Sequence, residues 1–175
     1  MKRISRRKLI GVVSGILGVL HMVPSVSAGT HKGFPEKYSD VYMPVSLTVG
    51  TIQTPEFVAD SQLYDILIQV EKPLPFNQMA CMMGVSDSPL DHCKSNDPLL
   101  RADWIVWNEG HIVSKGSSPT EVHAAFTDKY IFGLLGKFSG EVGKKYTVEV
   151  KFTKDGTPLN VANPHLIVIQ HKKFW

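Results

Sequence analysis

Apolar and polar residues alternate with a period of two along several stretches of this chain, and helical periodicity is nearly absent. Every second residue from Tyr146 to Phe152 is apolar, and the residues between them are polar or charged. The stretch from Tyr64 to Val70 alternates in a similar way, and so does the shorter one from Val45 to Val49. Such alternation predicts strands that bury mainly one face, and it is typical of antiparallel rather than parallel sheets.

Further strands are expected between residues rich in turn-forming side chains. Trp104–Trp107 leads into the turn Asn108–Gly110 and returns through His111–Val113, which predicts a hairpin. Shorter apolar runs predict strands at 78–83 and 166–169, and the run at 124–138 predicts a strand with bulges or bends because it contains two glycines. A helix is the competing interpretation of 124–138. The repeated short strands predict an all-β fold, an antiparallel immunoglobulin-like or jelly-roll β-sandwich.

The first 28 residues are expected to be an export signal rather than part of the sandwich. Five basic residues precede an apolar run from Leu9 to Val23, and Val26-Ser27-Ala28 offers small side chains for cleavage. The run is shorter than the roughly 20 residues of a membrane-spanning helix, which disfavours the alternative of a permanent anchor. We therefore expect a signal peptide at 1–28, one sandwich domain at 29–175, and a periplasmic or secreted location. Arg6-Arg7 resembles a twin-arginine signal, and ordinary unfolded export remains an equal alternative.

Removal of this leader changes the charge of the chain. The full sequence has 19 basic and 16 acidic residues, and the leader holds five of the basic ones, so the mature formal charge is −2 instead of +3. The basic character of the full chain is therefore no argument for nucleic-acid binding.

Both cysteines, Cys81 and Cys93, lie in the mature part. In an oxidising compartment, such a pair predicts a disulfide, which would stabilise the fold by about 3 kcal/mol in the chain-entropy model. A free catalytic thiol is the competing interpretation.

Methionines surround Cys81, and they suggest copper as an alternative function. The candidate ligands are His92, Met79, Met82 and Met83. Thioether and imidazole groups suit copper, whereas core packing beside a disulfide is the simpler role for the methionines. The alternation of a strand at 78–83 would place the side chains of Met82 and Met83 on opposite faces.

Candidate binding residues gather at the hairpin and in the loop that carries the second cysteine. They are His92, Trp104, Trp107, Asn108 and His111. Trp104 and Trp107 should face opposite sides of their strand, one toward the core and one available for contact. For catalysis, the sequence holds none of the nucleophile or phosphate-binding motifs, so a small hydrolase remains an alternative without an assembled site.

From Leu63 onward, over about two thirds of the chain, the pattern resembles uncharacterised secreted β-sandwich proteins of proteobacteria. The residues that carry this resemblance are Tyr64, Met83-Gly84, Trp104 to Gly116, Gly136-Lys137-Phe138, Gly143, Tyr146-Thr147-Val148 and Pro164 to Val168. The resemblance implies the fold and no particular activity.

The sequence therefore predicts an exported, non-catalytic binding protein that recognises another protein or a cell-envelope component, such as an inhibitor or immunity protein. No cofactor, nucleic acid or membrane anchor of the mature chain is expected. A periplasmic copper-binding protein and a small hydrolase are the alternatives.

Overall fold

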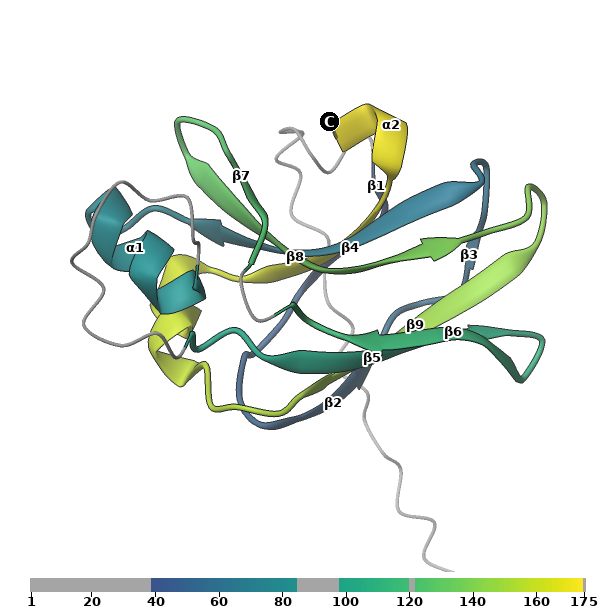
Figure 1. The fold of residues 1–175 in the computed structure, drawn as a ribbon, viewed down its shortest axis with the longest axis horizontal. Helices are drawn as coiled ribbons and strands as arrows, with labels where there is room; N and C mark the ends of the chain where they lie inside the picture. The colour runs from purple at the N-terminus through teal and green to yellow at the C-terminus, as the bar shows by residue number, and fades with distance from the viewer. Residues whose placement is uncertain (1–38, 85–97, 120–121, 175) are drawn as a thin grey trace, which may run out of the picture. The chain divides into compact units, whose positions relative to one another are not determined.

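Two antiparallel sheets account for the alternation in the sequence (Figure 1). The computed structural model describes residues 39–84, 98–119 and 122–174, which all belong to one compact unit, Lys32–Trp175. The expected signal peptide at 1–28 lies outside the described residues and stays a prediction.

The described strands divide between the sheets as follows. The first sheet has the order β1-β10-β4-β8-β7, formed by β1 (Ser39–Pro44), β10 (His165–Gln170), β4 (Leu63–Glu71), β8 (Tyr130–Ser139) and β7 (Ala124–Phe126). The second has the order β2-β9-β5-β6, formed by β2 (Gly50–Gln53), β9 (Lys145–Phe152), β5 (Ala102–Asn108) and β6 (His111–Ser117), and β3 (Phe57–Val58) also pairs with β9.

The pairing of the eight principal strands is nested. The outermost pair in the sequence is β1 with β10, and inside it lie β2 with β9, β4 with β8, and β5 with β6. The pairs β10 with β4 and β9 with β5 then join these hairpin arms into two sheets. This is the strand order of a jelly roll, so the predicted antiparallel sandwich is confirmed and the jelly-roll alternative describes its topology.

The expected strand at 78–83 is wrong, because these residues form the helix α1 (Phe76–Met83). Gly84 ends the helix in the left-handed conformation with φ of 77°, and its N–H donates to the carbonyls of Ala80 and Cys81. Met79 and Met83 lie one helical turn apart and are fully buried in the core between the sheets. Two short helices follow later in the chain: the 3-10 helix η1 (Thr157–Ala162) and α2 (His171–Phe174).

Two other expectations need correction. The stretch from Val45 to Val49 is the connection between β1 and β2 rather than a strand. There, the N–H of Leu47 donates to Asn160 Oδ1 at 2.9 Å and its carbonyl accepts from the Gly156 N–H at 2.8 Å. The backbone of Leu47 therefore bonds to a side chain and a loop instead of to a neighbouring strand. The second correction concerns β4, in which every residue from Tyr64 to Val70 is buried, so both faces are covered.

Trp104 of β5 connects the two sheets inside the core. The register between β4 and β8 shifts at Leu135, which leaves this residue as the extra one of a β-bulge. The carbonyl of Leu135 accepts a hydrogen bond from Trp104 Nε1 at 3.0 Å. The ring also fills the space beside Gly116 and Gly136: an added Cβ would lie 2.6 Å and 2.3 Å, respectively, from its nearest indole atom. The indole therefore requires glycine at both positions. The bend expected within 124–138 is confirmed as this bulge, and a turn divides the stretch into β7 and β8.

An aromatic cluster forms between β3, the start of β4, the end of β8 and the start of β9. Tyr64 stacks on Phe138 at a centroid distance of 5.2 Å, and Phe57 and Tyr146 complete the cluster. The Tyr64 hydroxyl donates to Asp60 Oδ1 at 3.0 Å and accepts from the N–H groups of Asp60 and Ser61. Burial is the main cause that raises the pKa of Tyr64 well above its ordinary value.

We predict that Gly136→Ala destabilises the protein by about 1–3 kcal/mol, because the new methyl group overlaps the indole of Trp104. In a Trp104→Phe background, the same change should cost less, since the smaller ring leaves room for the methyl. The measurement is a double-mutant cycle of urea unfolding free energies, with a coupling of at least about 0.5 kcal/mol. An equal cost in both backgrounds would contradict the contact.

We also predict that Tyr64 contributes to alkaline unfolding. A tyrosine whose pKa is raised by folding gives stability that is present below its unfolded pKa of about 10 and is lost as the pH rises above that value. The Tyr64→Phe variant should therefore lose less stability than the wild type between neutral pH and pH values above 10. Urea unfolding across this range measures the difference, and parallel declines in the two proteins would rule the effect out.

Candidate functional site

The hairpin of β5 and β6 carries most of the candidate binding residues that the structure describes. Its turn is Glu109–Gly110, with φ angles of 49° and 79°. Two consecutive positive φ values define the type I′ turn, whose twist suits a two-residue hairpin loop. Asn108 and His111 pair at the base of the turn, and Asn108 Nδ2 donates to the Lys145 carbonyl of β9 at 2.8 Å. The predicted hairpin is confirmed.

The two tryptophans face opposite sides of β5, as expected from their spacing. Trp104 belongs to the core with 7% of its surface exposed, so its role in the described fold is structural. Trp107 is half-buried and points to the outer side of the second sheet, where it pairs with Thr147 of β9. Of the candidate binding residues, Trp107 and Asn108 are half-buried and His111 is exposed.

The indole nitrogen of Trp107 is buried and has no hydrogen-bond partner among the described residues. A buried polar group left in this way costs about 1–3 kcal/mol, so native structures rarely contain one. The contrast with Trp104, whose Nε1 is paired at 3.0 Å, is clear. The fold thus gains no hydrogen bond from the nitrogen of Trp107.

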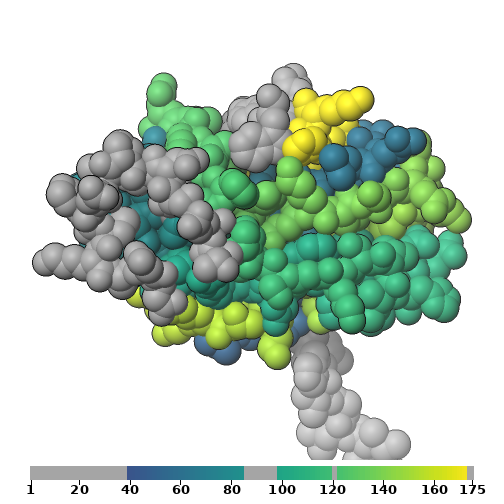
Figure 2. Space-filling view, viewed as in Figure 1, coloured from purple at the N-terminus to yellow at the C-terminus, as the bar shows by residue number. Residues whose placement is uncertain are grey.

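Two exposed aliphatic residues extend this surface, and the sequence reasoning did not select them. Ile112 is 51% and Val113 is 49% exposed, and they are consecutive on β6. The register between β5 and β6 shifts here, so Val113 has no partner residue on β5. The sequence did contain a signal for them, because both are β-branched residues that come shortly after a predicted turn, and such residues are common in strands. We call Trp107, Asn108, His111, Ile112 and Val113 the hairpin surface; the green segment to which this hairpin belongs lies toward the right of Figure 2.

The three methionines among the candidate copper ligands are placed by α1 rather than by a strand. Helical spacing puts Met79, Met82 and Met83 on neighbouring positions of one side, which corrects the strand geometry expected from the sequence. The thioethers of Met79 and Met83 are fully buried in the apolar core, and Met82 packs against it. His92 and Cys93 lie outside the described residues, so the disulfide with Cys81 stays a prediction. In the part of the chain that the structure describes, no three His, Cys, Asp or Glu side chains are grouped to hold a metal ion.

A buried carboxylate on the first sheet is a polar feature that sequence reasoning missed. Asp65 of β4 is fully buried, and its two oxygens lie 3.1 Å and 2.9 Å from His171 Nδ1 at the start of α2. Lys137 Nζ of β8 is 3.8 Å from the same carboxylate. A charged residue in the middle of an apolar strand was the available signal, because a buried carboxylate needs such partners. This cluster ties α2 to the sheet.

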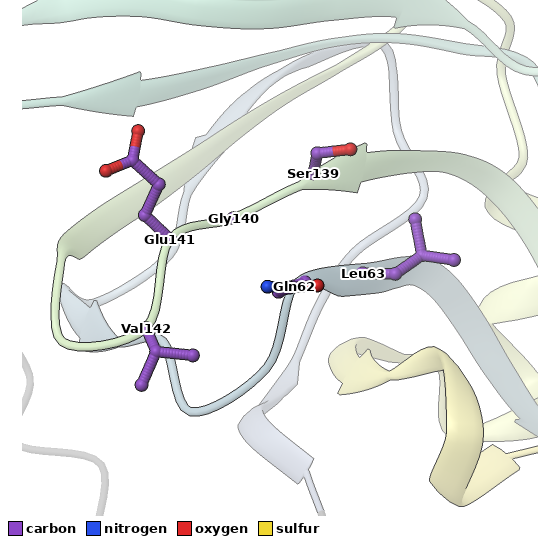
Figure 3. Close-up of a pocket in the computed structure, with 6 residues that line it drawn as sticks. All are labelled: Gln62, Leu63, Ser139, Gly140, Glu141 and Val142. Carbon is purple, nitrogen blue, oxygen red and sulfur yellow. The ribbon is translucent and has the colours of Figure 1, made fainter.

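Two hollows on the described surface have no catalytic arrangement. The larger, of about 560 Å³, lies where β4 begins and β8 ends. Figure 3 shows that its Glu141, Ser139 and Gln62 side chains do not converge on a common point. In the second hollow, of about 430 Å³, Glu71 accepts from Asn163 Nδ2 at 3.1 Å and Lys72 Nζ donates to the Thr127 carbonyl. These groups serve separate structural contacts rather than one acid–base pair.

Comparisons with models of protein families, with curated proteins and with solved structures found no match. Within the described residues, the helices are too short or too polar to cross a membrane. The hairpin surface is therefore identified from geometry alone.

We predict different effects of replacing each tryptophan by phenylalanine. Trp104→Phe should cost about 2–4 kcal/mol, because it leaves the buried Leu135 carbonyl without its donor and opens space in the core. Trp107→Phe should change the unfolding free energy by less than about 1 kcal/mol, since it removes a nitrogen that has no described partner. Urea unfolding of both variants provides the test. A cost for Trp107→Phe as large as that for Trp104→Phe would contradict the conclusion that the Trp107 indole adds little to the stability of the fold.

Proposed function

We propose that this chain is an exported, non-catalytic binding protein that recognises another protein or a cell-envelope component through the hairpin surface. The observation that carries the proposal is the exposed pair Ile112 and Val113 beside the half-buried Trp107. Exposed aliphatic and aromatic groups on a rigid hairpin supply contact area at low entropic cost. An inhibitor or immunity protein that acts in the cell envelope is a concrete example.

The hairpin is well placed for such a role. Its strand β5 is held by β9 on one side and by β6 on the other, and Trp104 anchors it to the first sheet. The Asn108 side chain fixes the turn to β9. A contact surface on a rigid element needs little ordering when a partner binds, which favours affinity.

The proposal includes export and a disulfide. We propose that the leader is removed after Ala28, that the mature chain acts in the periplasm or outside the cell, and that Cys81 at the end of α1 pairs with Cys93. An oxidising compartment permits this bond, and a jelly roll of this size gains stability from it. Mass spectrometry of the secreted product before and after reduction would test both points: a mass that retains residues 1–28, or two free thiols, would count against them.

The binding role is tested by pull-down from periplasmic extract together with a glycan array, followed by titration of any ligand that is identified. The double variant Ile112→Ser, Val113→Ser should weaken binding at least about tenfold, which corresponds to 1.4 kcal/mol. The matched control is Val142→Ser, Val161→Ser, because these valines are 66% and 70% exposed and lie outside the hairpin. The control should bind as the wild type does.

Two results would overturn the role. One is the absence of any ligand in both experiments. The other is a ligand whose affinity the hairpin variant leaves unchanged.

A further inference from the structure

The four strands that end the two sheet orders, β1, β7, β2 and β6, differ in how their free edges are protected. The edge strand β1 contains a register shift and ends in Pro44, β7 has only three residues, and β2 has four. Shortness, proline and bulges are the usual ways in which native sheets avoid edge-to-edge association. At seven residues, β6 is the longest of these edge strands and contains no proline. Its bulge at Val113 lies near the turn and leaves the stretch from Ser114 to Ser117 regular.

The hydrogen-bond pattern shows which backbone groups of β6 point away from β5. The Ser118 N–H donates to the Ala102 carbonyl at 2.7 Å, just beyond the pair Asp103–Ser117. Bonded and non-bonded pairs alternate in an antiparallel ladder. It follows that Ser114 and Gly116 bond to β5, whereas the N–H and C=O groups of Lys115 and Ser117 face outward. In the strand pairings of the described residues, β6 has β5 as its neighbour on one side and none on the other.

The side chains along this edge leave the backbone accessible. Gly116 has no side chain, and Trp104 beneath it excludes even a methyl group. A glycine within a strand often marks the place where another backbone approaches closely. Lys115 is the one fully charged residue of β6, and Ile112 and Val113 are exposed at its turn end.

We propose that the outer edge of β6 binds an extended segment of a partner protein, which adds to the second sheet as a further strand. Backbone hydrogen bonds from Lys115 and Ser117 supply affinity, and side-chain contacts supply selectivity, as in other cases of strand addition. The partner segment carries an apolar residue that packs on Ile112 and Val113 and an acidic residue near Lys115. This inference rests on the proposed binding function and assigns to it a partner class and a mode of recognition.

A synthetic peptide with the sequence of β5 (residues 102–108) is a suitable probe, because this sequence already pairs with β6 on its inner side. The readout is amide hydrogen exchange followed by NMR on the full chain. At saturating peptide, exchange of the Lys115 and Ser117 amides should slow at least about tenfold. The Ser114 and Gly116 amides, which already bond to β5, should change little and serve as internal references.

Ser117→Pro removes one outward N–H and should abolish the peptide-induced protection without breaking the ladder to β5. Ser117→Ala is the matched control, because both variants lose the hydrogen bond from Ser117 Oγ to Asp103, and alanine keeps the N–H. The alanine variant should bind the peptide as the wild type does. Unfolding curves of the two variants verify that both are folded.

Three results would overturn the inference. The first is unchanged exchange at Lys115 and Ser117, and the second is equal peptide protection of the proline variant. The third is protection that grows with protein concentration without peptide, which would assign the edge to a second copy of the chain. Absence of any ligand in the pull-down and glycan array would instead count against the binding function, and the peptide experiment distinguishes the two failures.

Discussion

The contact of Trp104 with the facing sheet determines much of the rest of this structure. Its indole reaches from β5 to β8, bonds to the carbonyl that the bulge at Leu135 releases, and occupies the space above Gly116 and Gly136. The indole, the bulge and the glycine at position 136 depend on one another. Without the bulge, the Leu135 carbonyl would be used by the ladder, and with any larger residue at Gly136, the ring would not fit. Trp104 and the backbone that accommodates it therefore form one specific contact between the two sheets within the larger core.

This contact also links the core to the outer edge of β6. Gly116 has no side chain for a reason that lies in the interior, because a Cβ there would be 2.6 Å from the indole. The consequence appears at the surface, where β6 presents bare backbone between Lys115 and Ser117. The packing of Trp104 against Gly116 therefore leaves this position of the β6 edge without a side chain. The same hairpin includes Trp107, whose nitrogen brings no hydrogen bond to the described fold. Departures from local rules of this kind are expected where a surface serves binding.

The sequence predicted the fold where alternation was strong, and it failed where other contacts override the pattern. Alternation from Tyr146 to Phe152 is preserved in β9, with every second residue buried. In β4 the same reasoning underestimated burial, because the apolar Leu67 between Ile66 and Ile68 packs with Phe132 and Ile167 in a second cluster on the other face. The error at 78–83 came from treating a short apolar run as a strand, although methionine, alanine and glutamine favour helices and Gly84 is a typical helix end. The nested strand order was beyond a single sequence, because pairs such as β1 with β10 join residues more than one hundred positions apart.

The candidate site was only partly accessible from the sequence for a related reason. Spacing alone placed Trp104 and Trp107 on opposite faces, but it could not say which of them enters the core, since that depends on Leu135 of a distant strand. Ile112 and Val113 are exposed and lie at the register shift between β5 and β6, which periodicity does not show. An open edge of seven residues also carries a risk of aggregation, which the other three edges reduce by shortness or a terminal proline, and β6 by Lys115 and a bulge near its turn. The regular stretch from Ser114 to Ser117 is the part of this edge that the proposed partner strand would cover.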